Sequence, residues 1–90
     1  ARDNKIFNKI SRVSASRILL SLERYDEALS MIEKYSLGDT NAPIHELAGD
    51  ILFKQGKVNL AINQYEAAEE KYTDQTSKSI ISMKIASISN

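Results

Sequence analysis

The sequence predicts an all-α fold: a short solenoid of two helical hairpins followed by a single capping helix. Apolar residues recur at helical spacings of three and four along five segments, and no segment shows the period-two alternation of a half-buried strand. A run of fourteen residues also repeats after 33 positions, because Ser16–Leu29 aligns with Gly49–Ile62. A repeat of this length is typical of stacked helical hairpins, which bury their apolar faces against one another.

The clearest hairpin lies in the stretch from Gly49 to Ala68. Gly56 is expected in its turn, because a residue without a Cβ adopts a left-handed conformation at little cost. Gly49 and Ala61 are expected to face each other across this turn, so that two small residues let the helices approach closely. The apolar residues of the second helix follow helical spacing: Ala61, Ile62, Tyr65 and Ala68.

The first hairpin is expected to begin with a helix from about residue 4 to residue 22, without an internal Gly or Pro. Leu22, Glu23 and Arg24 break this helix. The second helix runs from Tyr25 to Tyr35, with acidic residues in its first turn, where the helix dipole favours negative charge. Residues 36–42 collect Gly, Asp, Thr and Asn, and they form the clearest predicted loop.

Pro43 suits the first turn of the next helix, with Asn41 or Thr40 as its N-cap, and this helix runs to about Gln55. Its partner is expected at residues 58–72, and residues 73–76 break the chain before a last helix from about residue 77 to 88. One further step of 33 residues places Ser82 on Gly49, so the last helix corresponds to half of a third unit. The predicted units are residues 8–35 and 42–72, with a capping helix at residues 77–88.

Composition limits the classes of function. Twelve basic and twelve acidic side chains cancel in 90 residues, which disfavours nucleic acid as a partner. There is no cysteine, and the single histidine, His45, is predicted to be a partly exposed helix residue rather than a metal ligand. No phosphate-binding loop and no catalytic pair is present. We therefore predict a protein without enzymatic activity, metal or cofactor.

The first helices of successive hairpins line the concave side of such an array, and this side is the candidate protein-binding face. We expect Leu20, Phe53 and Met83 to contact an apolar or extended partner segment, while charged neighbours set the polarity. The alternative is that Arg17 pairs with Asp50 and that Leu20 and Phe53 belong to the core between the hairpins. The predicted face consists of nine residues: Val13, Arg17, Leu20, Ser21, Glu46, Asp50, Phe53, Lys54 and Met83.

The fourteen-residue match, together with Tyr65 and Ala68, resembles the tetratricopeptide repeat (TPR), whose period is about 34 residues. The array diverges from that motif, because Leu19 and Leu52 stand where the first helix usually carries an aromatic residue, and no Pro follows Tyr72. The resemblance implies a right-handed TPR-like solenoid that interacts with other proteins.

Three segments extend the resemblance to nearly all of the chain: Tyr25–Leu29, Leu47–Gly56 and the tail Met83–Ile85. In this order they resemble the C-terminal part of the YfgM-like family, the ancillary subunits of the SecYEG translocon. That resemblance implies an N-terminal anchor in the bacterial inner membrane, a TPR-like domain in the periplasm, and partners among translocon components or periplasmic chaperones. It also implies that these residues are a fragment of a longer chain, without a membrane span of their own.

Two alternatives to this function remain at the level of sequence: a cytoplasmic TPR scaffold that binds a peptide segment, and a TPR appendage of a larger enzyme or regulator. A further candidate surface lies at the N-terminal end of the array. Ile6, Phe7 and Ile10 are apolar there, and we expect them either to pack on a preceding repeat or to mediate self-association.

Overall fold

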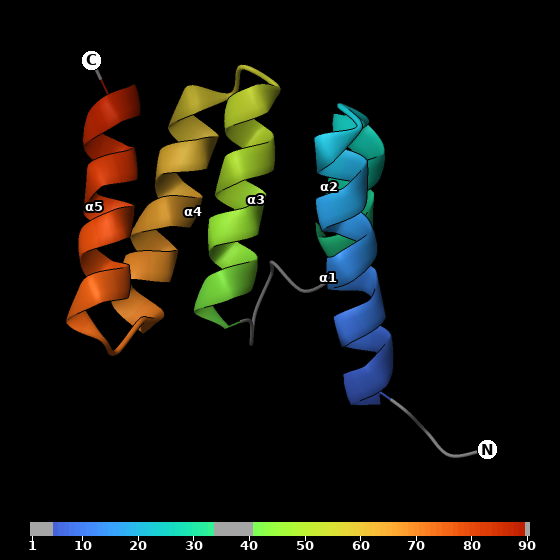
Figure 1. Cartoon of the computed structure of the whole chain (residues 1–90). Coiled ribbons are helices and arrows are strands. Elements are labelled where there is room, and N and C mark those ends of the chain that lie inside the picture. The colour runs from blue at the N-terminus through green and yellow to red at the C-terminus, as the bar shows by residue number, and fades with distance from the viewer. Residues whose placement is uncertain (1–4, 34–40, 90) are drawn as a thin grey trace.

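The computed structural model describes residues 5–33 and 41–89, with side chains described from residue 8 onward. Within these ranges the chain forms five helices and no strand, which confirms the predicted all-α array of two hairpins and a closing helix (Figure 1). The helices are α1 (Lys5–Ser21), α2 (Tyr25–Ile32), α3 (Ala42–Lys54), α4 (Val58–Lys71) and α5 (Gln75–Ile88).

The helices stack in chain order, so each hairpin contacts its neighbour through consecutive elements. α2 packs on α3, and α4 packs on α5 (Figure 1). One buried cluster joins the two hairpins: Ala28, Ile32, Ile44, Leu47, Ala48 and Ile51. A second fills the second hairpin and continues beneath α5: Ala42, Leu52, Ala61, Tyr65, Ala68 and Ile81. Burial of each large side chain contributes about 1.5–3 kcal/mol, so these clusters are the main source of stability.

The two hairpin turns repeat each other in detail. Glu23 has a φ of 61° and Gly56 a φ of 83°, and these two residues are 33 positions apart. In the first turn the amide of Arg24 donates to the carbonyl of Leu19 at 2.9 Å, and the amide of Lys57 donates to the equivalent carbonyl in the second turn at the same distance. The breaks predicted at these positions are therefore confirmed, although Glu23 adopts a conformation that costs a residue with a Cβ about 1 kcal/mol.

Side-chain caps fix where α3 and α5 begin. Asn41 is the N-cap of α3, and its side chain accepts a hydrogen bond from the Ile44 amide at 3.2 Å. Of the two caps predicted for this helix, Asn41 is therefore the one that is confirmed. The Asp74 side chain accepts one from the Ser77 amide at 2.8 Å. The prediction that the last helix begins at Ser77 is wrong by two residues, because Asp74 caps it and Gln75 is already helical. The end expected for the helix after Tyr25, at Tyr35, and most of the loop at 36–42 lie outside the described residues.

Small residues allow close approach of the helices within each hairpin. In the first hairpin the buried hydroxyl of Ser16 donates to the carbonyl of Ala28 at 2.8 Å. In the second, a Cβ built on Gly49 would lie 2.6 Å and 2.7 Å from two ring carbons of Tyr65. A small residue is thus required at Gly49, but the group that it accommodates is the Tyr65 ring and not Ala61, which corrects the sequence-based reason.

Candidate protein-binding face

The centre of the predicted face is an ionic cluster that joins α3 to α5. The ammonium of Lys84 lies 2.7 Å from Oε2 of Glu46 and 3.1 Å from Oδ1 of Asp50. Glu46 and Asp50 are one turn apart on α3, so one cation from the closing helix reaches both carboxylates. Burial alone raises the pKa of Glu46, but hydrogen bonds from Lys84 and Tyr72 outweigh burial and lower it. Both carboxylates are therefore compensated from within the chain.

Two tyrosines of α4 and its C-terminal cap complete this cluster. The hydroxyl of Tyr65 donates to Oδ1 of Asp50 at 2.5 Å, and the hydroxyl of Tyr72 donates to Oε1 of Glu46 at 2.7 Å. Burial and the bond to Glu46 raise the pKa of Tyr72 to about 12. Burial and the bond to Asp50 likewise raise the pKa of Tyr65 above its usual value. Both phenols thus stay protonated and act as donors at neutral pH.

The predicted pairing of Arg17 with Asp50 is wrong. Asp50 is bonded to Lys84 and Tyr65, and Arg17 makes no hydrogen bond or ion pair with any described residue. Its positive charge still acts on Glu46 and lowers the pKa of that carboxyl, after the larger effects of burial and of the Lys84 and Tyr72 bonds. Arg17 is exposed and has no partner of its own among the described residues.

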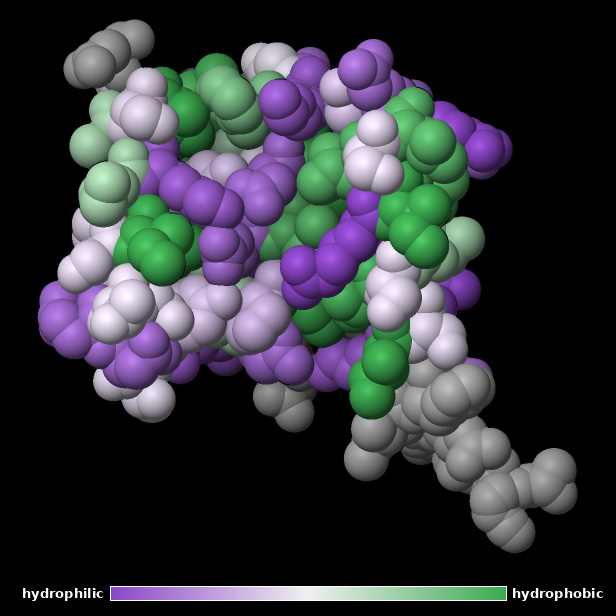
Figure 2. Space-filling model, viewed as in Figure 1, coloured by the Kyte–Doolittle hydropathy of each residue, from purple (hydrophilic) through white to green (hydrophobic). Residues whose placement is uncertain are grey.

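Arg17 lies where two hollows meet along the space between α1 and α3. The larger hollow has a volume of about 560 Å³ and is lined by apolar residues that include Ile10, Val13 and Ile44. The smaller, of about 380 Å³, is lined by Leu20, Ser21, Glu23, Tyr25 and Lys54 together with Arg17. Figure 2 shows hydrophobic surface between α1 and α3, crossed by a hydrophilic side chain. We call this feature the α1–α3 groove.

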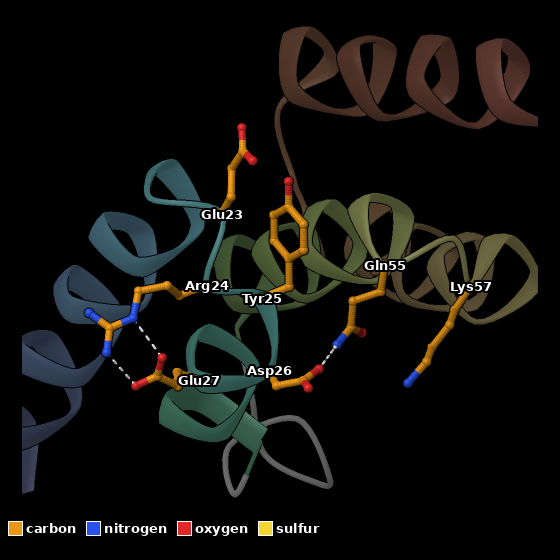
Figure 3. A pocket seen from close by; sticks show the side chains of 7 residues that line it. All are labelled: Glu23, Arg24, Tyr25, Asp26, Glu27, Gln55 and Lys57. Atoms are coloured by element: carbon orange, nitrogen blue, oxygen red, sulfur yellow. Dashed lines mark hydrogen bonds and ion pairs between the residues drawn. The ribbon is translucent and has the colours of Figure 1, made fainter.

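A separate polar pocket lies where the two hairpin turns meet (Figure 3). Arg24 bonds Glu27 at 2.6 Å, and the amide of Gln55 donates to Asp26 at 2.6 Å. The Oε1 of Gln55 is buried and accepts no hydrogen bond from the described residues. Tyr25 points away from the side chain of Asp26 and from this pairing. The pocket is therefore a contact between turns, while Tyr25 also belongs to the α1–α3 groove.

The nine predicted face residues fall into three sets. Arg17, Leu20, Ser21 and Lys54 line the smaller hollow, and Val13 lines the larger one with Arg17. Glu46 and Asp50 lie in the ionic cluster with Lys84. Phe53 and Met83 are 40% and 70% exposed and line neither of these two hollows. Phe53 is consequently not part of the core between the hairpins.

Sequence reasoning missed Lys84 as the partner of both carboxylates. A signal was present, because the 33-residue step aligns Lys84 with Ile51 and Ile18. A cation at a position that is apolar in the other two units indicates a polar partner on the neighbouring helix. Glu23 and Tyr25 of the groove were also missed as site residues, since Glu23 lies in the turn and Tyr25 begins α2, both outside the predicted face of the first helices.

The position of His45 also corrects an expectation. His45 is buried rather than partly exposed, and its Nδ1 lies 2.9 Å from Oε1 of Gln64. At the α4–α5 contact, Glu69 receives hydrogen bonds from Lys78 to its carbonyl and from Ser82 to its carboxylate. Among the described residues, no group of three or more His, Asp or Glu side chains is arranged to hold a metal ion.

The apolar N-terminal end is only partly described. The side chains of Ile6 and Phe7 lie outside the described residues, and Ile10 is exposed in the groove, so self-association through these three stays a prediction. Another apolar surface follows from the repeat. Ile18 on α1 is 61% exposed, whereas its equivalent, Ile51, is fully buried against the first hairpin. The face of α1 that carries Ile18 is therefore exposed, whereas the equivalent face of α3 packs on α2.

Comparison with protein families gives one result for this chain. The family model described as a tetratricopeptide repeat-like domain matches residues 1–90. Neither the curated proteins nor the solved structures contain a match. None of the helices in the described ranges has both the length and the hydrophobicity of a membrane-spanning helix.

Proposed function

Because the chain belongs to the tetratricopeptide repeat-like domain family, we propose that it is a non-enzymatic protein–protein interaction domain. The observation that carries this proposal is the α1–α3 groove. Its apolar floor is flanked by Arg17 and Lys54, two exposed cations that make no hydrogen bond or ion pair with the described residues. A groove of this composition buries apolar groups of a partner while charges at its edge select and orient that partner.

The more specific proposal is the periplasmic part of an accessory subunit of the protein translocon, anchored in the bacterial inner membrane. Its support is the resemblance of Tyr25–Leu29, Leu47–Gly56 and Met83–Ile85 to the YfgM-like family. The partners would be translocon components or periplasmic chaperones. A link between the two would place a chaperone next to a chain that emerges from the membrane.

Protease accessibility and co-purification test this location and these partners. In spheroplasts of the source bacterium, external protease should degrade this domain of the full-length protein while a cytoplasmic marker stays intact. After solubilisation in mild detergent, the translocon subunits should co-purify with it. Protection from protease together with a soluble full-length protein would overturn the periplasmic proposal and support the cytoplasmic scaffold. A catalytic domain in the full-length chain would support the appendage.

A substitution in the groove tests whether that surface carries the interaction. Arg17→Glu reverses the charge where the two hollows meet, and Lys71→Gln removes a cation from the exposed surface of α4. We expect Arg17→Glu to abolish co-purification and Lys71→Gln to preserve it, with equal helical signals by circular dichroism. Equal capture by both variants would show that another surface makes the contact.

A further inference from the structure

The outer face of α5 lies at the end of the array opposite the first hairpin (Figure 1). We propose that two copies of the chain associate through this face, with α5 of one copy packed antiparallel on α5 of the other. The contact centres on Ile80 and Met83, which are 47% and 70% exposed. This inference goes beyond the proposed function and is independent of the α1–α3 groove, because no residue of α5 lines either of its hollows.

The first support is the absence of charge on this face. Eight residues of α5 are exposed, and all are uncharged: three serines, a threonine, a glutamine, an alanine, Ile80 and Met83. The two lysines of the helix bond to the array instead, Lys78 to the carbonyl of Glu69 and Lys84 to the carboxylate of Glu46, each at 2.7 Å. Each of the other four helices has a charged residue among its exposed ones. The outer face of α5 can therefore be buried without removing any charge from water.

The second support is that α5 is apolar on both sides. Ile81 is fully buried beneath the helix, and Ile85 and Ile88 pack against the same cluster. Ile80 and Met83 are exposed on the other side. A helix that closes an array in water is expected to have a polar outer face, whereas a helix that is apolar all round is normally buried. α5 thus has the composition of a helix that is covered on its outer side as well.

The order of residues along this face favours a second copy as the covering partner. Thr76, Ile80, Met83 and Ser87 follow one another at spacings of four, three and four residues, so they form one stripe of the helix. The midpoint between Ile80 and Met83 is also the midpoint between Thr76 and Ser87. A two-fold axis through this point places Ile80 against Met83 of the other copy, and Thr76 against Ser87 of the other copy. The stripe is therefore self-complementary, as a two-fold contact requires.

Hydroxyl groups at the two ends of the stripe fit the same arrangement. The Ser87 hydroxyl donates to the carbonyl of Lys84 at 3.1 Å, so its oxygen keeps lone pairs that can accept a hydrogen bond. The Thr76 hydroxyl makes no hydrogen bond with a described residue. In the antiparallel pair, Thr76 of each copy would donate to Ser87 of the other, which gives two equivalent hydrogen bonds at the edges of the contact.

Charge disfavours pairing of two copies through α1, at the other end of the array. α1 has four basic residues and no acidic one: Lys5, Lys9, Arg12 and Arg17. Two α1 helices would therefore repel each other, since like charges brought together across an interface are unfavourable. The two lysines of α5 bond to α4 and α3, so two α5 helices meet without such repulsion.

Sedimentation velocity of the 90-residue chain measures the association. We expect a shift from monomer to dimer with increasing concentration, and a melting temperature that rises with it, because dimerisation stabilises the folded state by mass action. Met83→Lys should weaken the dimer about tenfold or more, since it buries an ammonium without a partner. Leu60→Lys is the matched control, because Leu60 on α4 is 52% exposed and lies outside the stripe.

The control should leave the dissociation constant of the dimer within about twofold of the parent, because its substitution lies away from the contact. Both positions are exposed, so the helical signals of the two variants should equal that of the parent. A chain that stays monomeric throughout, or equal dissociation constants for Met83→Lys and Leu60→Lys, would overturn the proposal.

Disulfide cross-linking tests the antiparallel register in a chain that contains no cysteine of its own. A mixture of Thr76→Cys and Ser87→Cys should cross-link on oxidation, because the two positions face each other across the contact. Thr76→Cys alone should not. Its two copies would lie about 17 Å apart at about 1.5 Å per residue, and a disulfide needs Cα atoms within about 7 Å. Efficient cross-linking of Thr76→Cys alone would indicate a parallel pair and overturn the arrangement.

Two further outcomes would assign the contact elsewhere. Ile18→Lys changes the exposed face of α1, and we expect it to leave the dimer intact. If it weakens the dimer as much as Met83→Lys does, the copies associate end to end through α1, and the proposal is overturned. Co-purification with the translocon subunits should persist in Met83→Lys. Loss of co-purification in that variant, with a parent chain that stays monomeric, would assign the face of α5 to another protein and overturn the self-association.

Discussion

The contact between Gly49 and Tyr65 gives a sharp test of how the second hairpin is packed. Gly49→Ala adds one methyl group, whose carbon would lie 2.6 Å, 2.7 Å and 3.0 Å from three ring carbons of Tyr65. Carbon atoms pack favourably at about 3.5–4.0 Å, so the ring must move by about 1 Å. Tyr65 is only 3% exposed and its hydroxyl is held by Asp50 at 2.5 Å, so such a movement disturbs both the core and the ionic cluster.

Two opposing effects determine how much Gly49→Ala changes the free energy of unfolding. Overpacking of a core typically costs about 1–3 kcal/mol. Gly49 lies within α3, and replacing a glycine in a helix interior by alanine gains about 1 kcal/mol. The contacts of 2.6 Å and 2.7 Å place the overpacking cost in the upper part of its range, at about 2–3 kcal/mol, so the net expectation is a loss of about 1–2 kcal/mol. A domain of this size loses about 4–8 °C of melting temperature per kcal/mol, so the variant should melt at least about 4 °C below the parent.

Thermal and urea unfolding followed by circular dichroism measure this change. The matched control is Gly49→Ala in a Tyr65→Leu background, where the ring is absent and the methyl group has space. There the substitution should be neutral or stabilising, which gives a coupling free energy of about 1–3 kcal/mol between the two sites. A Gly49→Ala variant as stable as the parent would refute the packing argument and show that helix propensity dominates.

Three other substitutions test the turn and the ionic cluster. Glu23→Gly should raise the free energy of unfolding by about 1 kcal/mol in urea, because glycine adopts the φ of 61° without strain; no gain would show that the turn is not strained. The lowered pKa of Glu46 stabilises the fold above the pKa of the unfolded state, and this contribution is lost as the pH falls through the folded pKa. Glu46→Gln should therefore lower stability by about 1 kcal/mol at pH 7 and flatten the decline of melting temperature below about pH 5, whereas an unchanged acid profile would contradict it. Lys84→Met should cost about 1–2 kcal/mol because two carboxylates lose their shared cation, and Lys84→Met with Asp50→Asn should recover part of that loss in the same assay.

The sequence predicted the array because its signals are local and periodic. Helical spacing, the 33-residue step and turn residues such as Gly56 each depend on a few neighbouring positions, and together they placed all five helices to within a few residues wherever the ends are described. The start of α5 was missed because Asp74, in a stretch predicted to be a break, proved to be a cap. His45 was misjudged because its surroundings include a residue that is distant in the sequence, Gln64 of α4, whose Oε1 lies 2.9 Å from its Nδ1.

The candidate face was harder to predict because its chemistry depends on the packing of one unit against the next. The repeat correctly placed Arg17 and Asp50 at equivalent positions, but it did not determine which charged groups meet. Asp50 turns to α5 and not to α1, since Lys84 replaces an apolar residue of the repeat there. Among the described residues, Arg17 is therefore left without a hydrogen-bond or ion-pair partner at the junction of the two hollows.

The closing helix accordingly has two physical roles, carried by two of its residues. It covers the apolar end of the second hairpin through Ile81, which is fully buried, and it neutralises the carboxylates of α3 through Lys84. Without that cation, the carboxylate of Glu46, whose pKa the charge of Arg17 also lowers, would lose its nearest positive charge and act more strongly on Arg17. The half-unit that ends the array thus sets the charge of a groove two helices away, although Lys84 itself does not line it.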